Sequence, residues 1–209
     1  MFITFEGPEG SGKSSQAQLL FHHLEQAGRR VLLTREPGGT ALGDRLRGLL
    51  MAAADVAIVP QAEVLLFAAA RAQLVAEVIR PGLATGGIVI CDRYSDSTLA
   101  YQAFGRGLEL DAVRRVVDFA TAGLVPDLTV LLDLPPEEGL RRKGAEPSDR
   151  FEREDLAFHR RVREGYLALA RRSPARWLVL DARGSRDELA AAIRARVEAQ
   201  LASRPSGVA

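Results

Sequence analysis

A stretch near the N-terminus has the residue types and the spacing of a phosphate-binding loop. Residues 7–14 read Gly-Pro-Glu-Gly-Ser-Gly-Lys-Ser and match the pattern G-x-x-x-x-G-K-[ST] in full. Glycines let such a loop curl until several backbone N–H groups point at one phosphate, and the helix that follows adds its positive N-terminal end. Lys13 would hold the β- and γ-phosphate oxygens, and the Ser14 hydroxyl would hold Mg²⁺. The sequence therefore predicts a site for a nucleoside triphosphate, formed by consecutive residues: Gly7, Pro8, Glu9, Gly10, Ser11, Gly12, Lys13, Ser14 and Ser15.

Asp92 is the expected protein partner of that Mg²⁺. It follows a continuous apolar run, Gly87 to Cys91, which is typical of a strand buried on both faces. In a parallel sheet, ligands bind beyond the carboxyl ends of the strands, so a carboxylate here would lie opposite the phosphate loop. An aspartate in this place could instead cap a helix, and that is the alternative interpretation.

Phe67 and Arg71 could bind the flat base of a second nucleotide. They lie four residues apart in a predicted helix and therefore share a face. An aromatic plane beside a forked donor suits stacking and hydrogen bonding to a base. By themselves, however, the two residues fit a core phenylalanine beside a snorkelling arginine better than a base site.

The composition limits the class of protein to which these residues belong. The 209 residues suit one domain, and 47% of them are hydrophobic, which is enough to build a core. A net charge of +1 is not typical of a general nucleic-acid binder, and the absence of asparagine rules out the Asn-Lys-x-Asp motif by which GTPases read guanine. No apolar run approaches the roughly 20 residues that a membrane span needs, and the N-terminus does not look like a signal peptide. Because Cys91 is the single cysteine, we expect no internal disulfide and a cytoplasmic protein. From the balanced charge and the short apolar runs we expect no nucleic-acid or membrane partner.

Five apolar strands that alternate with helices must position these residues. The strands are expected at about 2–5, 30–34, 87–91, 128–134 and 177–180, and the pattern predicts an α/β fold with a parallel sheet and helices on both faces. Helices are expected at about 12–27, around 42–50, at 60–79 with a stop at Pro81-Gly82, from Ser95, from Asp111, at 152–172 and at the C-terminal end. A charged stretch at 141–150 contains helix-breaking residues, among them Pro147, and lies between the last two predicted strands. The polar residues Arg35, Asp92, Arg93 and Asp181 all follow predicted strands, as a ligand site at the carboxyl edge requires.

The motifs together resemble the thymidylate kinase family, of the bacterial type with arginines in the lid. The resemblance is carried by residues 5–14, by Thr-Arg-Glu-Pro-Gly-Gly-Thr at 34–40, by 67–71, by Asp-Arg-Tyr at 92–94 with the residues up to 102, by Pro-Asp-Leu at 126–128 and by Asp-Arg-Phe-Glu at 149–152. It covers nearly the whole chain in order. It implies the fold of the phosphate-loop nucleoside monophosphate kinases, with a five-stranded parallel sheet, a single domain over 1–209 and a lid at about 141–151. The implied reaction is ATP + dTMP → ADP + dTDP with Mg²⁺, and members are typically homodimers.

The resemblance also assigns the acceptor nucleotide to particular residues. In it, Phe67 would stack on thymine, Arg71 would bond the edge of the base, and Arg93 would hold the 5′-phosphate. Tyr101 would crowd the 2′ position of the sugar, and Glu9 would reach the 3′-hydroxyl. The complete acceptor set comprises Glu9, Arg35, Pro37, Phe67, Arg71, Arg93, Thr98, Tyr101 and Gln102.

The positive charge that stabilises the transferring phosphoryl group is expected to come from the lid. The variable loop positions 8–11 contain no basic residue, and family members of this type supply an arginine from the lid. An arginine in that place contributes about 10³–10⁵ in rate. Of the lid cations Arg141, Arg142, Lys143 and Arg150, we favour Arg150 or Arg142, although a solvated charged loop is the alternative for any single one. The predicted catalytic set is Lys13, Arg93, Arg150 and Arg142.

Three functions remain to be separated at this stage. The first is phosphorylation of dTMP, which needs no general base because a phosphate with a second pKa of about 6 is already anionic. The second is phosphorylation of another monophosphate or of a deoxynucleoside, for which Glu36 is the one nearby base candidate. The third is nucleotide binding without turnover. Arg183, after the last strand, could stack on the adenine of ATP or be an ordinary loop residue.

Overall fold

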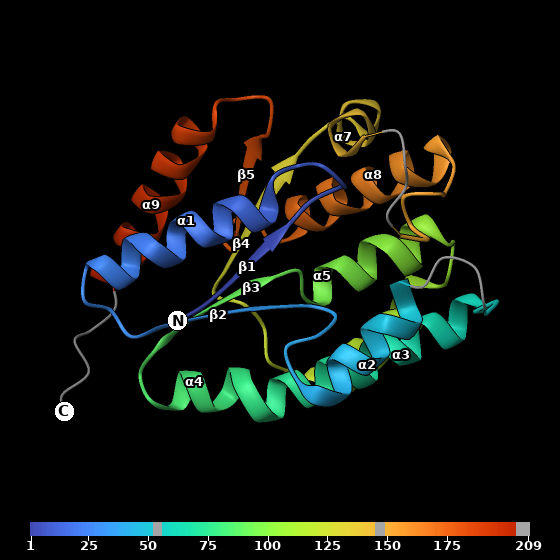
Figure 1. Cartoon of the computed structure of the whole chain (residues 1–209), viewed down its shortest axis with the longest axis horizontal. Coiled ribbons are helices and arrows are strands. Elements are labelled where there is room, and N and C mark those ends of the chain that lie inside the picture. Colours follow the sequence, from blue (N-terminus) through green and yellow to red (C-terminus); the bar gives the residue numbers. More distant parts are fainter. Residues whose placement is uncertain (52–55, 145–148, 204–209) are drawn as a thin grey trace.

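A parallel sheet of five strands forms the centre of the protein (Figure 1). The computed structural model describes residues 1–51, 56–144 and 149–203. Its strands are β1 (Phe2–Glu6), β2 (Val31–Arg35), β3 (Ile88–Asp92), β4 (Leu128–Asp133) and β5 (Trp177–Asp181). Their order across the sheet is β2-β3-β1-β4-β5, and every neighbouring pair is parallel. The predicted strands and the predicted fold class are therefore confirmed.

Helices cover both faces of this sheet (Figure 1). One face packs against α1 (Lys13–Gln26) and α9 (Arg186–Ala202), which also contact each other. The other face packs against α3 (Pro60–Leu74), α6 (Leu110–Thr121), α8 (Leu156–Arg172) and the segment that begins with α5 (Ser95–Thr98). The remaining helices are α2 (Ala41–Met51), α4 (Arg80–Ala84) and α7 (Pro136–Lys143).

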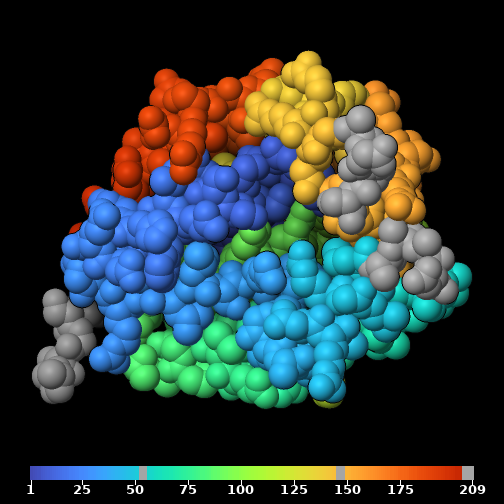
Figure 2. Space-filling view, viewed as in Figure 1, coloured from blue at the N-terminus to red at the C-terminus, as the bar shows by residue number. Residues whose placement is uncertain are grey.

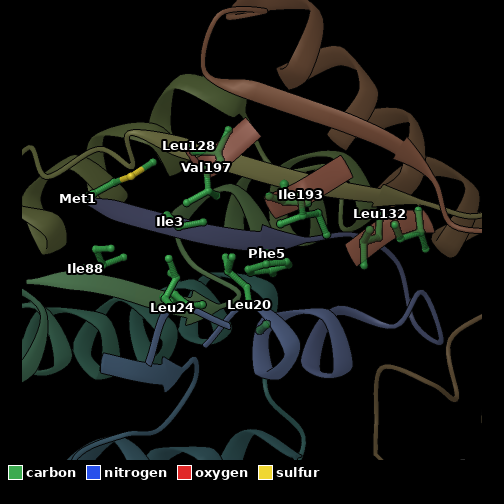
Figure 3. Packing of buried hydrophobic residues seen from close by; sticks show 14 of the residues in the cluster. Met1, Ile3, Phe5, Leu20, Leu24, Ile88, Leu128, Leu132, Ile193 and Val197 are labelled. Carbon is green, nitrogen blue, oxygen red and sulfur yellow. The ribbon is translucent and has the colours of Figure 1, made fainter. Parts of the chain in front are cut away.

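Alternation along β1 divides the core between the two faces. Ile3 and Phe5 are fully buried and pack with Leu20 and Leu24 of α1 and with residues of α9 (Figure 3). Phe2, on the opposite face, packs with residues of α3 and β3. A strand buried on both faces explains why residues 2–5 read as an unbroken β-rich run and why the polar Glu6, at its end, is buried as well.

The helix predicted to stop at Pro81-Gly82 continues to Ala84, so that boundary is wrong. After α3 the chain forms a π-helical segment, Val75–Ile79, and then α4, in which Pro81 occupies the first turn. A proline lacks the N–H that an α-helical ladder needs at its position. A π-helical turn changes the ladder to bonds five residues apart, as in the bond from Arg80 N to Val75 O, so the helix passes the proline without ending.

Two other boundaries near the site differ from the prediction. The helix expected from 152 begins at Leu156, because the Asp155 side chain accepts a hydrogen bond from Phe158 N at 2.6 Å and caps it there. Before it, the Asp149 side chain accepts bonds from Phe151 N and Glu152 N and turns the chain. The helix from Ser95 changes after Thr98 into a π-helical segment, Leu99–Gly105. Pro147, in the predicted lid, lies outside the described residues.

Candidate active site

A cavity of about 420 Å³ opens at the carboxyl ends of the strands. The space-filling view shows the molecule hollowed between the blue phosphate loop and α1, the cyan α2 and the yellow α7 (Figure 2). Its walls come from the phosphate loop, the chain after β2, helices α2 and α3, the chain from the end of β3 to Gln102, the end of α7 and the chain before α8. The predicted acceptor residues and most of the predicted donor residues therefore line one cavity, as the position of the strand ends requires; Gly7, Pro8, Ser11 and Arg183 are not among its lining residues.

The phosphate loop has the backbone geometry that an anion site needs. Gly7, Gly10 and Gly12 all have positive φ, at 145°, 69° and 89°, and helix α1 starts at Lys13 with no side chain capping its N–H groups. Those N–H groups are available to a ligand. The Lys13 ammonium donates to Pro8 O at 2.8 Å and to Ser11 Oγ at 3.3 Å. Burial lowers the pKa of Lys13 to about 8, and the charge of Arg93 adds to this lowering.

The loop also packs directly on the helix that begins the lid. A Cβ atom placed on Gly10 would collide with the carbonyl group of Gly139 in α7, and a Cβ on Gly139 would collide with the carbonyl oxygen of Glu9. Both positions must therefore be glycine for the two backbones to approach this closely.

Ser14 and Asp92 lie together at the mouth of the loop. The Ser14 hydroxyl donates to Asp92 Oδ2, and both residues line the cavity. Two oxygen donors next to a phosphate site suit Mg²⁺, which usually takes one or two protein ligands and completes its shell with phosphate and water. In the described ranges no group of three or more His, Cys, Asp or Glu residues could hold a metal ion by itself.

Arg93 lines the cavity and is held there by partners from four elements. It follows β3 with a positive φ of 68°, and its N–H bonds to Phe5 O of β1. Its guanidinium donates to Glu9 Oε1 at 2.8 Å and to Tyr101 OH and Tyr166 OH, both at 3.2 Å. A left-handed backbone at a non-glycine residue costs free energy. It persists here because these contacts hold both the backbone N–H and the guanidinium group of Arg93.

Glu9 has its charge stabilised by this arrangement. Burial raises the pKa of Glu9, but the charges of Arg93 and Lys13 outweigh burial and lower the value to about 2. Tyr101 OH adds a hydrogen bond to Glu9 Oε1 at 2.7 Å. Glu9 is therefore an anionic acceptor at the pH of a cell, able to accept a hydrogen bond from a sugar hydroxyl.

Glu6 supports Arg93 from behind. Its carboxylate accepts from Tyr94 N at 2.8 Å and from Ser97 Oγ at 2.5 Å, and Tyr166 OH donates to it at 3.1 Å. Burial raises the pKa of Glu6 to about 8, and the nearby Asp96 carboxylate adds to this rise. In the sequence, Glu6 and Ser97 lie within motifs that carry the family resemblance but have no predicted role, and Tyr166 has no local signal that distinguishes it from a core residue.

The cavity is also lined by the residues of the predicted base site. Phe67, Thr98, Tyr101 and Gln102 line it together with Arg71. Arg71 is 1% exposed, so the sequence-based alternative of a snorkelling arginine is wrong. Its Nε and Nη2 atoms bond Glu36 Oε2 at 2.8 and 2.6 Å, and its buried Nη1 has no hydrogen-bond partner within the described part of the chain.

Arg35 and Pro37 lie on the cavity wall as predicted, and they are joined by a residue that the sequence did not indicate. Arg47, from α2, lines the same wall and donates to Pro37 O at 3.0 Å. Burial lowers the pKa of Arg47, and the neighbouring Arg35 charge contributes to the lowering. Two adjacent cations on one wall favour an anionic ligand. Helix α2 carries two arginines, Arg45 and Arg47, and no sequence signal distinguishes Arg47 as a site residue.

The lid cations take different positions. Arg142 lines the cavity and bonds Glu138 at 2.6 Å and Ala182 O at 3.0 Å, while Lys143 lines it and pairs with Glu152 at 2.8 Å. Arg150 instead forms an ion pair with Glu63 and is not among the residues that line the cavity. Lid residues 145–148 lie outside the described ranges. Arg183 is exposed, pairs with Asp181 at 2.5 Å and is likewise not brought to this cavity.

A comparison with family models identifies the group to which the sequence is related. The thymidylate kinase family model matches residues 5–193. The chain belongs to the thymidylate kinase family. Thymidylate kinases from Trichlorobacter lovleyi and Deinococcus radiodurans are 52% and 54% identical to it, over 97% and 94% of this chain and 99% and 96% of theirs. A solved thymidylate kinase from Ehrlichia chaffeensis is 33% identical, covers 94% of this chain and 98% of its own, and superposes with a TM-score of 0.78.

Membership confirms the fold and the reaction implied by the sequence motifs. The chain is a thymidylate kinase family enzyme, a nucleoside monophosphate kinase that phosphorylates dTMP. The alternatives of nucleotide binding without turnover and of a different acceptor are not favoured. None of the helices in the described ranges is long and apolar enough to cross a membrane.

Proposed function

We propose that this thymidylate kinase family member holds ATP on the phosphate loop and dTMP between Phe67 and Arg93. The observation that carries this is one cavity lined by Lys13 of the phosphate loop, by Phe67 and Arg71 of α3, and by Arg93. Two phosphorylated ligands that enter from opposite ends would meet at Arg93. Positioning accelerates the reaction by holding the donor and the acceptor close together and in the right orientation.

The acceptor is proposed to bind with thymine on the Phe67 ring and with Arg71 donating to its edge. The unpartnered Arg71 Nη1 supports this, because a buried donor without a partner is costly unless a ligand satisfies it. Gln102 and Thr98 complete the wall around the base, and Glu9 accepts from the 3′-hydroxyl. Tyr101, fixed by its bonds to Glu9 and Arg93, leaves little room for a 2′-hydroxyl.

The transfer itself needs charge neutralisation rather than proton abstraction. The dTMP phosphate is already anionic, so its oxygen can attack without a base. Lys13 and the α1 N-terminus would stabilise the donor phosphates, with Gly7, Pro8, Gly10, Ser11, Gly12 and Ser15 forming the rest of the loop. Arg93, with Arg35 nearby, would hold the acceptor phosphate.

Ser14 and Asp92 are proposed to hold the Mg²⁺ that accompanies ATP. Their contact at the mouth of the loop, with both side chains on the cavity wall, supports this assignment. When bound, the ion would neutralise charge on the β- and γ-phosphates.

The lid cation is proposed to be Arg142 rather than Arg150. Arg142 lines the cavity, whereas Arg150 is engaged by the buried Glu63. Arg183 remains a candidate for stacking on adenine, since it follows β5 at the same edge of the sheet.

We further propose a homodimer and a cytoplasmic location. Leu65 of α3 and Phe119 of α6 are 59% and 90% exposed on neighbouring helices, which supports a protein partner there. A single cysteine, Cys91, suits a reducing compartment. Light scattering on the purified protein tests the dimer, and a mass of 22.6 kDa would contradict it.

An assay of ADP release with dTMP, dUMP, dCMP, dGMP and thymidine tests the proposal. We expect the highest kcat/KM with dTMP. Turnover of thymidine without turnover of dTMP would refute it. Lys13→Ala should lower kcat by about 10²–10³ while circular dichroism stays unchanged, because it removes a charge aimed at the transferring group. Unchanged turnover in that variant would mean that the phosphate site is assigned wrongly.

A further inference from the structure

Glu63 is a fully buried carboxylate that the proposed mechanism does not use. It lies in the first turn of α3, the helix that also carries Phe67 and Arg71, and its exposed fraction is 0%. Glu63 Oε1 accepts from Gln102 Nε2 at 2.8 Å. Gln102 is itself 1% exposed and lines the same cavity as Phe67 and Arg71. A buried carboxylate thus contacts, from outside the cavity, a side chain that forms part of its wall.

The chemistry of this contact fixes the orientation of the Gln102 amide. A carboxylate oxygen only accepts hydrogen bonds, whereas an amide has a donating NH₂ and an accepting oxygen. Gln102 must therefore turn its NH₂ group toward Glu63. A rotation by half a turn would place the amide oxygen against the carboxylate and lose the bond. The oxygen Oε1 is the atom left for a ligand in the cavity.

An accepting oxygen at this place distinguishes between pyrimidines. Thymine and uracil carry a proton on N3 and donate there, while the N3 atom of cytosine is an acceptor. We propose that Glu63 is a specificity-determining positioning residue, which holds the Gln102 amide with its oxygen toward the base so that the site accepts thymine and uracil and rejects cytosine. This inference rests on the proposed binding of dTMP at Phe67 and Arg71.

The charge on Glu63 is supported independently of the base site. Arg106 donates to both of its oxygens at 3.3 Å, and Arg150 pairs with Oε2. Arg106 also pairs with Glu154 at 2.6 Å, so the cluster contains two carboxylates and two guanidinium groups. Glu63 and Glu154 thus share a cation, but only Glu63 contacts Gln102.

Arg71 adds a second, separate element of selectivity. Its guanidinium only donates, so it favours a carbonyl oxygen on the base edge and opposes the amino group of cytosine. Loss of the Glu63 contact should therefore weaken the discrimination against cytosine rather than abolish it.

The test compares Glu63→Gln with Glu154→Gln, using kcat/KM for dTMP, dUMP and dCMP. The amide introduced by Glu63→Gln can donate as well as accept. The Gln102 amide can therefore rotate by half a turn and still form a hydrogen bond with it. We expect the dTMP-to-dCMP ratio to fall by about tenfold, from the loss of one well-placed hydrogen bond and the gain of a matching one. The dTMP-to-dUMP ratio should stay unchanged, because both bases donate from N3. Glu154→Gln removes the same charge from the same cluster and should leave both ratios as they are.

Three results would overturn the inference: an unchanged dTMP-to-dCMP ratio in folded Glu63→Gln, an equal fall in both ratios, or the same change in Glu154→Gln. If Glu63→Gln does not fold, the double variant Glu63→Gln, Arg106→Gln removes opposite charges together and gives the same readout. Failure of the proposed function is distinguishable, since the unaltered enzyme would then show no preference for dTMP in the same assay.

Discussion

The buried ion pair between Glu36 and Arg71 should be the most sensitive point of the site to a single substitution. The two side chains are 3% and 1% exposed, and two N–H groups of Arg71 meet one oxygen of Glu36 at 2.6 and 2.8 Å. Arg71 also donates to Tyr94 O at 3.1 Å. Burial raises the pKa of Glu36 while Arg71 lowers it, so each charge depends on the other for compensation.

Replacement of one partner leaves the other charged and buried. Removing half of such a pair costs about 3–5 kcal/mol in unfolding free energy. Glu36→Gln keeps the shape and one hydrogen bond, so we expect the lower end, roughly 3 kcal/mol. For a chain of this size that corresponds to a fall in Tm of roughly 6–12 °C. Urea unfolding followed by the fluorescence of Trp177, the single tryptophan and 5% exposed, measures it.

A double variant separates stability from recognition. Glu36→Leu with Arg71→Met replaces the pair by apolar groups and should regain most of the lost stability, because no charge then remains buried. The same variant should raise KM for dTMP by tenfold or more, about 1.4 kcal/mol, because the donor to the base edge is gone. A loss below about 1 kcal/mol in Glu36→Gln would refute the reasoning, since the pair would then be effectively solvated.

Three further outcomes are expected. Tyr101→Phe should lower kcat/KM for dTMP by about tenfold with little change in KM for ATP, because Glu9 and Arg93 each lose a hydrogen bond; a larger effect on ATP would contradict this assignment. The pKa of Glu6 is raised from 4.5 to about 8 by burial, so the stability that its proton provides is complete below 4.5 and is lost as pH rises through about 8. Glu6→Gln should reduce this loss of stability with rising pH. Urea titrations at the two ends of the pH range measure it, and the same pH dependence in both proteins would refute the prediction. Ser14→Ala should raise the Mg²⁺ concentration for half-maximal activity roughly tenfold, and an unchanged Mg²⁺ titration would place the ion elsewhere.

The strands and the phosphate loop could be predicted because their signals are local. An unbroken apolar run such as residues 88–91 and a contiguous motif such as 7–14 carry their structure within a few residues. The strand order could not be computed from these runs alone. It depends on pairing between residues far apart in the chain.

Features that depend on distant residues were missed. The helix from Pro60 passes Pro81 because a π-helical turn precedes the proline, and no sequence pattern announces that turn. Arg150 appears in the sequence as one of several lid cations, but its partner Glu63 lies 87 residues away. Arg71 looked like a snorkelling arginine until Glu36, 35 residues earlier, was found beside it.

The backbone contact between Gly10 and Gly139 restricts where a guanidinium group can be placed in this scaffold. An arginine at position 10 would have to adopt a φ of 69° and push against the α7 backbone, which leads into Arg142. Gaining a cation in the loop at that position would displace the helix that carries Arg142, the lid cation that we propose. The two arrangements exclude each other here, and a descendant that moved its charge into position 10 would have to rebuild the start of the lid helix in the same step.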